Sequence, residues 1–143
     1  MTPLDCGNII KTELRRCAKI CHEHFGWASI KLDIRYDLRG TAAGSAHKDR
    51  RVRFNLLLLM EQTIHDVQQV AAHEFAHIVV YRRWHESHTP RTIEQPVYDE
   101  AAFVAAADDI PSPHGQEWRR TMHLFGFYPQ RCHKFDITKH RRR

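Results

Sequence analysis

The first part of the chain carries apolar side chains at three- and four-residue spacing, which is the periodicity of an amphipathic helix. Thr2 is a suitable N-cap, Pro3 suits the first helical position, and Asp5 stands three residues after the cap. Gly26 is suited to end this helix. The predicted core-facing stripe consists of Ile10, Leu14, Cys17, Cys21 and Phe25.

A strict alternation of apolar and polar residues then replaces the helical spacing. Residues 30–37 place apolar side chains on one face and charged ones on the other, as a half-buried strand does. A second strand, rich in small residues, is expected at 41–46, and a third at 52–56. Residues 47–50 suit the hairpin loop between them. The pattern therefore predicts a small three-stranded antiparallel sheet.

Two amphipathic segments in the second half predict further helices. Thr63, followed three residues later by Asp66, should begin a long helix that ends near Trp84. The other segment covers residues 114–125 and is closed by Gly126. Its apolar face consists of Trp118, Met122 and Phe125.

The stretch between these two helices is mixed in character. Residues 85–95 are polar and include a proline, which indicates a loop, whereas the alanine-rich residues 97–108 favour a helix. The chain has 143 residues, which suits one domain. We expect the α+β class, with an N-terminal helix, a small sheet, a long central helix and C-terminal helices.

The composition is that of a soluble globular protein, with 42% hydrophobic and 27% charged residues. No apolar run approaches the roughly 20 residues that cross a bilayer. The N-terminus lacks the charged and apolar regions of a signal peptide. We therefore expect a cytoplasmic protein without membrane association. Cys17 and Cys21 share a helical face, which is poor geometry for a disulfide, so reduced thiols are expected.

The formal net charge is +5, and the chain ends in a basic run. We divide the chain into a domain at 1–133 and a basic tail at 134–143. The basic side chains of the tail are Lys134, Lys139, Arg141, Arg142 and Arg143. Such side chains can neutralise DNA phosphates. A solvated chain end without a partner is the alternative.

The stretch from His73 to His77 has the sequence H-E-F-A-H, which carries the clearest chemical signal. On a helix, residues four apart lie on one face, so both imidazoles can bind a single Zn²⁺. Glu74 would lie beside the water that zinc activates, where it can act as the general base. The motif therefore predicts a zinc hydrolase, with a peptidase as the expected kind.

A catalytic zinc site takes three protein ligands, so a third must come from elsewhere in the chain. The metzincin spacing is excluded, because Val80 and Arg83 stand where that class has a glycine and a histidine. Glu100 could serve as in thermolysin-like sites, although Val104 replaces their usual acidic partner. His114 is the stronger candidate, because it begins the last predicted helix after a proline-containing turn.

Several segments together resemble the SprT-like metallopeptidases and occur in that family's order. They are Leu32–Gly40, Ala43–Ala46, Arg53–Asn55, His73–His77, Pro113–Trp118 with Met122 and Gly126, and Arg131–His133. In this family the third zinc ligand is the histidine of a His-Gly pair, which corresponds to His114. The zinc-binding histidines and the glutamate of the helix correspond to His73, His77 and Glu74.

The resemblance implies a zincin-like fold and a zinc-dependent endopeptidase. It also implies a role like that of the Spartan branch, which cleaves proteins crosslinked to DNA and is stimulated by DNA. Many relatives carry a C-terminal zinc ribbon of four cysteines. After His114 this sequence has only Cys132, so the resemblance covers the protease domain and not the ribbon. The expected partners are therefore protein substrates, with DNA bound through the basic surface and tail.

Two other functions stay open at this point. One is a non-catalytic nucleic-acid-binding or adaptor module in which zinc stabilises the fold, and the other is a zinc amidohydrolase acting on a small substrate. Glu74 favours an enzyme, because a structural site has no need of a general base. Arg131 and His133 could approach the cleft and stabilise an oxyanion, or could belong to a surface turn.

Overall fold

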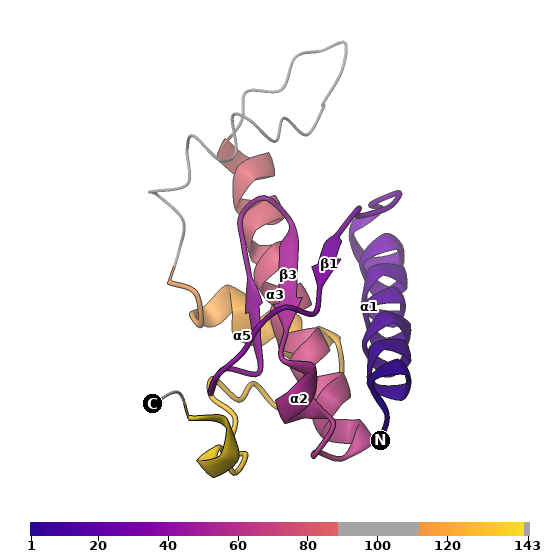
Figure 1. Cartoon of the computed structure of the whole chain (residues 1–143). Helices are drawn as coiled ribbons and strands as arrows, with labels where there is room; N and C mark the ends of the chain where they lie inside the picture. Colours follow the sequence, from indigo (N-terminus) through magenta and orange to yellow (C-terminus); the bar gives the residue numbers. More distant parts are fainter. Residues whose placement is uncertain (89–111, 142–143) are drawn as a thin grey trace.

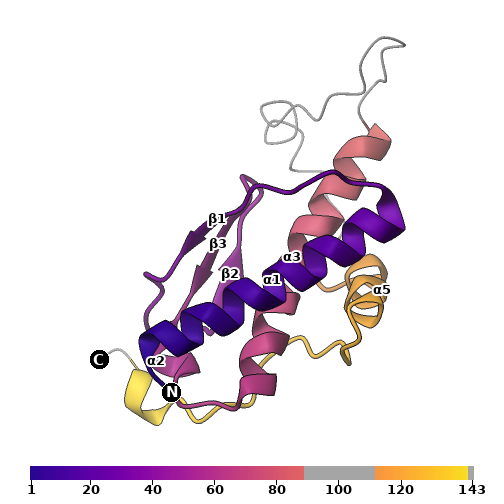
Figure 2. The same ribbon diagram turned by 90° about the vertical axis from the view of Figure 1, so that its right-hand side faces the viewer.

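The structure is a computed structural model that describes residues 1–88 and 112–141. In chain order the elements are α1 (Pro3–Phe25), β1 (Asp33–Arg35), β2 (Gly44–Ala46), β3 (Arg51–Phe54), α2 (Leu56–Leu59), α3 (Ile64–His88), α5 (Gln116–Leu124) and the 3-10 helix η2 (Thr138–His140). Helix α3 runs through the middle, with the sheet on one side, α5 on the other and α1 alongside (Figures 1 and 2). The described residues therefore form a mixed α and β domain with one small sheet.

Helix α1 confirms the predicted start and end. The hydroxyl of Thr2 accepts a hydrogen bond from the Asp5 N–H (3.0 Å), and the Asp5 carboxylate accepts one from the Thr2 N–H (3.1 Å). Gly26 ends the helix with a φ of 73°, which favours glycine, and its N–H bonds to the His22 carbonyl. The buried apolar stripe contains Cys6, Ile10, Leu14, Cys17 and Cys21, and all of its cysteines are free thiols.

The sheet has a different topology from the predicted one. Strand β3 lies in the middle, parallel to β1 and antiparallel to β2, so the prediction of an all-antiparallel sheet is wrong for β1. The chain after β1 crosses the end of β3, where the Asn55 amide donates to the carbonyls of Gly40 (2.9 Å) and Ala42 (3.1 Å). Alternation of side chains identifies the faces of a strand, but it does not identify the pairing partner.

The hairpin between β2 and β3 is confirmed, but the third strand is shorter than predicted. The turn is closed by a bond from the Arg50 N–H to the His47 carbonyl (3.0 Å). Strand β3 ends at Phe54, because the Asn55 side chain accepts a bond from the Leu58 N–H (3.2 Å) and starts α2. Leu56, predicted to lie in the strand, is therefore helical.

Helix α3 begins as predicted, with reciprocal bonds between Thr63 and Asp66 of 3.1 and 3.3 Å. It continues to His88, beyond the predicted end at Trp84, so residues 85–88 of the expected loop are helical, and residues 89–95 lie outside the described part of the chain. Its middle turns are buried among the sheet, α1 and α5. The buried apolar residues are Val67, Ala71, Ala72, Phe75, Ala76, Ile78, Val79 and Val80. The predicted helix at 97–108 lies outside the described residues.

Helix α5 is the last predicted helix, although it begins at Gln116 and not at 114. Trp118, Met122 and Phe125 are buried as expected, and Gly126 follows with a φ of 88°. After it, Phe135 and Ile137 pack against the core. The division at residue 133 stays a prediction. Within residues 1–88 and 112–141, no helix has the length and apolar character needed to span a membrane.

Candidate metal centre

Two imidazoles on α3 face the same point. His73 and His77 are one turn apart in the buried middle of the helix, and their Nε2 atoms lie 3.3 Å from each other. His77 is buried and His73 is half-buried. The side-chain spacing expected from the sequence is therefore present, because residues at i and i+4 project from one face of a helix.

The third imidazole comes from the turn that leads into α5. The Gly115 N–H donates to the Ser112 carbonyl (3.0 Å), which folds this turn tightly and brings His114 over α3. The Nε2 atoms of His114 and His73 lie 3.2 Å apart. The candidate ligand atoms of His73, His77 and His114 all lie within 4.8 Å of one another. Glu100, the other candidate from the sequence, lies outside the described residues.

The spacing of the three imidazoles fits one metal ion. In a tetrahedral site with metal–nitrogen bonds of about 2.0–2.1 Å, neighbouring ligand nitrogens lie roughly 3.3–3.4 Å apart. The Nε2 atoms of His77 and His114 lie 3.3 and 3.2 Å from that of His73, in agreement with this value, and all three ligand atoms lie within 4.8 Å of one another. A shared proton can satisfy only one such pair of nitrogens, whereas a cation at the centre satisfies all three lone pairs. These three residues can therefore hold a metal ion.

Surrounding groups orient the imidazole of His73. Its Nδ1 lies 3.2 Å from the Gln130 carbonyl, which can only accept a hydrogen bond, so Nδ1 must carry the proton. Nε2 of the neutral ring then presents its lone pair to the other two imidazoles. This is the arrangement by which groups beyond the ligands hold a metal-binding histidine in one tautomer.

Trp118 supports all three histidines from one side. Its ring centroid lies 4.8 Å from those of His73 and His114, and 5.8 Å from that of His77. Its indole N–H also donates to the His73 carbonyl at 3.2 Å. The sequence identified Trp118 only as a core residue. Its position four residues after His114 was the available signal of a role beside the imidazoles.

Burial keeps the imidazoles neutral. The pKa of His73 is lowered to about 4 and that of His77 to about 3, mainly because burial removes the water that would stabilise the charged form. The pKa of His114 is also lowered, first by burial and then by the positive charge of Arg131. A neutral imidazole has the free lone pair that metal binding requires. The site is thus prepared for a cation at neutral pH.

Glu74 lies beside this cluster with its carboxylate buried. Its Oε1 is 3.7 Å from Nε2 of His73. Burial raises the pKa of Glu74 to about 8, and a cation held by the histidines would oppose that rise. A Cβ on Gly44 would lie 3.0 Å from Cγ of Glu74, so only glycine lets β2 approach the carboxylate this closely.

The remaining predicted site residues lie near the cluster with other contacts. Nε2 of His133 donates to the Thr41 carbonyl at 2.8 Å, and its ring stacks on Phe135. Arg131 is exposed, and its charge acts on His114. A pocket of about 420 Å³ lies between the start of α3 and residues 130–136, and its wall includes His73. An oxyanion role for Arg131 or His133 stays a prediction.

A comparison with known families assigns the chain. A profile described as the SprT-like family matches residues 12–91, which is more than half of the sequence. This chain belongs to the SprT-like family. The family match includes His73, Glu74 and His77 but ends before His114, so the placement of His114 rests on the geometry of the structure.

Individual SprT proteins align with most of the chain. Protein SprT of Pasteurella multocida (strain Pm70) is 28% identical over 131 residues, which cover 90% of this chain and 65% of that protein. Protein SprT of Yersinia pseudotuberculosis (serotype IB, strain PB1/+) is 30% identical over 138 residues, which cover 95% of this chain and 67% of that protein. The chain thus spans about two thirds of the length of these relatives. No solved structure matches it.

Proposed function

We propose that this chain is a zinc-dependent endopeptidase with a zincin-like active site. His73, His77 and His114 bind the metal, and Glu74 is the general base. The observation that carries the proposal is the convergence of three imidazole nitrogens next to one buried carboxylate. Zinc is the metal proposed because a site of three histidines with an open position is a common catalytic zinc site.

The residues divide the work of peptide hydrolysis between them. Zn²⁺ supplies Lewis acidity, which polarises the scissile carbonyl group and makes water nucleophilic at neutral pH. Glu74 accepts the proton of the attacking water on its carboxylate and passes it to the leaving amine. Its position, with Oε1 3.7 Å from Nε2 of His73, places the carboxylate beside the metal ligands for both proton transfers.

Strand β2 supports a peptide as the substrate. It lies at the edge of the sheet in the order β1-β3-β2, and Gly44 places it against Glu74. An extended peptide can pair with such an edge through main-chain hydrogen bonds. A chain bound in this way would pass over the carboxylate and the three imidazoles. The arrangement favours cleavage within a polypeptide over hydrolysis of a small amide.

We extend the proposal to the substrate: proteins bound or crosslinked to DNA. Family membership and the net charge of +5 support this class, because a basic surface attracts DNA and the proteins carried on it. The basic residues Lys139 and Arg141 lie on or next to η2. A contact of 3.1 Å between His140 and Glu61 holds η2 close to the start of α3.

The proposal is tested by measuring the rate of protein cleavage by the Glu74→Gln variant. We expect cleavage of an unfolded protein, and of a protein crosslinked to single-stranded DNA, to fall by about 10²–10⁴-fold, which is the usual contribution of a general base. Zinc content should not change. Glu23→Gln, at an exposed position of α1, is the matched control and should behave as wild type. Equal rates for both variants would remove Glu74 from the mechanism. Zinc-loaded wild-type protein that cleaves neither substrate would favour the adaptor function.

A further inference from the structure

The pocket of about 420 Å³ between the start of α3 and residues 130–136 adjoins the metal centre. His73, a proposed metal ligand, belongs to its wall, and so does Val70, which lies one turn earlier on α3. The chain on the other side is anchored at the same imidazole, because the Gln130 carbonyl lies 3.2 Å from Nδ1 of His73. A peptide bound at the metal centre can therefore place a side chain in this pocket.

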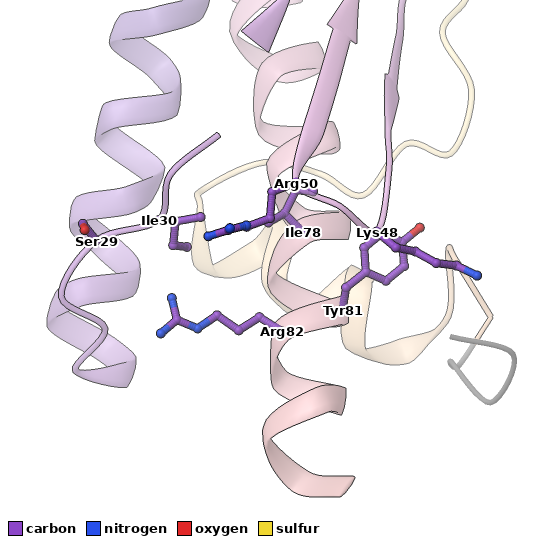
Figure 3. Close-up of a pocket in the computed structure, with 7 residues that line it drawn as sticks. All are labelled: Ser29, Ile30, Lys48, Arg50, Ile78, Tyr81 and Arg82. Carbon is purple, nitrogen blue, oxygen red and sulfur yellow. The ribbon is translucent and has the colours of Figure 1, made fainter. Parts of the chain in front are cut away.

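The direction of β2 decides which substrate side chain this is. Gly44, at the start of the strand, lies against α3 near the pocket: a Cβ there would be 3.3 Å from Cγ1 of Val70 and 3.0 Å from Cγ of Glu74. Lys48, in the turn that follows β2, lies beside Tyr81, further along α3 (Figure 3). Strand β2 thus runs in the same direction as α3, away from the pocket.

A peptide that pairs with β2 in the antiparallel manner runs the opposite way. Antiparallel pairing is the more frequent arrangement and is slightly more stable per residue. The residues before the scissile bond then lie toward Tyr81, and those after it lie toward Val70. The pocket receives the side chain of the residue that follows the scissile bond. This placement of the substrate rests on the proposed endopeptidase function.

Two carboxylates belong to the lining, and each keeps one oxygen without a donor in the described part of the chain. Asp66 accepts the Thr63 N–H with Oδ2 (3.3 Å), and Asp136 accepts the N–H and hydroxyl of Thr138 with Oδ1 (3.0 and 2.8 Å). The bonds from Thr138 hold the pKa of Asp136 below its ordinary value. Neither carboxylate forms a salt bridge within residues 1–88 and 112–141.

Three glutamines of the lining add acceptor oxygens. The side-chain amides of Gln62, Gln69 and Gln130 each donate one N–H to a backbone carbonyl, at 2.9–3.3 Å. A carbonyl only accepts, so these contacts identify the nitrogen of each amide. Among the residues that the structure describes, none donates to the three amide oxygens. These oxygens are therefore available to a donor on a ligand.

Positive charge in the lining is smaller than negative charge. Lys134 carries the ammonium group among the described lining residues, and it is exposed. The nearby His140 is paired with Glu61 at 3.1 Å. Two carboxylates against one ammonium group attract a cation. The size also suits a long side chain, because a cavity of roughly 150 Å³ already holds benzene.

We propose that this pocket selects lysine or arginine as the residue that follows the scissile bond, through Asp66 and Asp136. An ammonium or guanidinium group has only donors, which match the acceptor oxygens of the lining. Its aliphatic stem can pack on Val70 and Phe135. The preference suits the proposed substrates, since proteins that bind DNA present lysine and arginine to the phosphates.

Three fluorogenic peptides that differ only at the residue after the scissile bond (lysine, leucine or glutamate) test the proposal. For zinc-loaded wild-type protein, we expect kcat/KM to be at least about tenfold higher with lysine than with glutamate, because the pocket attracts one charge and repels the other. Mass spectrometry of the products identifies the bond that is cleaved. Equal rates, or a preference for lysine before the scissile bond, would overturn the proposal.

Asp66→Asn and Asp136→Asn remove the charge but keep an oxygen that can accept the bonds of Thr63 and Thr138. Each should lower the ratio of kcat/KM for lysine and glutamate about threefold or more. Asp33→Asn, at an exposed ion pair on β1, is the matched control and should keep the wild-type ratio. A loss of stability or of zinc would lower both rates together and leave the ratio unchanged. An unchanged ratio in both pocket variants would contradict the role of these carboxylates.

Binding of the same peptides to zinc-loaded Glu74→Gln protein separates the pocket from the chemistry. Fluorescence anisotropy should give the highest affinity for the lysine peptide, and Asp66→Asn added to this background should reduce that difference. Equal affinities would overturn the pocket assignment and leave the peptidase function intact. Absence of cleavage by wild type, with the order of affinities retained, would overturn the peptidase function and support the pocket.

Discussion

Helix α3 carries two polar sites within a short distance, and their electrostatics are opposite. At the metal centre, burial keeps His73 and His77 neutral, so that their lone pairs can receive a cation. One turn further along α3, Arg82 lines a small pocket with Arg50 of the β2–β3 hairpin and forms an ion pair with Glu86 at 3.1 Å. The His73 and Arg82 side chains are exposed to similar extents, 16% and 20%, so the difference lies in the chemistry of the side chains. Partial burial is enough to remove the charge of an imidazole, whose ordinary pKa is about 6.5, but not that of a guanidinium, whose ordinary pKa is above 12.

Loss of His114, one of the proposed metal ligands, should have the largest effect. His114→Ala removes one of three imidazoles. Mutation of groups that only support metal ligands already lowers metal affinity about 10–100-fold, so we expect His114→Ala to lower zinc affinity by more than roughly 100-fold. His123→Ala, at an exposed position of α5, is the control and should retain zinc. Zinc content is measured after dialysis against a competing chelator. Full zinc occupancy in His114→Ala would move the third ligand to Glu100 or elsewhere.

Crowding Glu74, the proposed general base, should reduce turnover without affecting zinc binding. Gly44→Ala places a Cβ 3.0 Å from Cγ of Glu74 and should displace the carboxylate by a few tenths of an ångström. We expect kcat/KM for protein cleavage to fall about tenfold, with zinc binding unchanged. Gly7→Ala, where the nearest atom is 3.8 Å away, should keep full activity and stabilise α1 by about 1 kcal/mol. Wild-type turnover in Gly44→Ala would show that β2 does not position Glu74.

Two of the three tryptophans, Trp118 and Trp27, offer a matched test of the comparison. Trp118→Phe keeps an aromatic ring beside the imidazoles but loses the N–H donated to the His73 carbonyl, so zinc should bind up to about tenfold more weakly. Trp27→Phe alters the ring under Arg82 and should leave zinc affinity unchanged. Zinc competition on both variants measures this. An equal loss of zinc affinity in both variants would show that the sites are not separate.

The smallest effect expected is that of salt. Raising NaCl from about 50 to 200 mM should lower the preference for lysine over glutamate roughly twofold to fivefold, because the carboxylates of Asp66 and Asp136 are at least partly exposed and are screened. Zinc occupancy should stay constant, since coordination bonds to buried neutral nitrogens are not screened. A preference that does not change with salt would mean that these carboxylates do not cause it.

The helices were predictable because their signals are local. Thr2 with Asp5, and Thr63 with Asp66, cap the helices that they were expected to cap, since a capping box depends on residues three apart. The strand order was not predictable. It depends on the path from β1 to β2, which the bonds of Asn55 hold across the end of β3, and no residue within the strands reports that path.

The same distinction applies to the sites. His73 and His77 followed from a four-residue spacing, and His114 from the turn before the last helix. The pocket beside His73 was not found in the sequence because Asp66 and Asp136 come from two distant segments.

X-ray absorption at the zinc edge tests the central claim most directly. For wild-type protein loaded with one equivalent of zinc, we expect a first shell of nitrogen and oxygen atoms at roughly 2.0–2.1 Å, with outer-shell scattering from three imidazoles and no sulfur near about 2.3 Å. His114→Ala should reduce the imidazole count to two. A sulfur ligand, or an unchanged count of imidazoles in His114→Ala, would contradict the assignment of His73, His77 and His114 as the metal ligands.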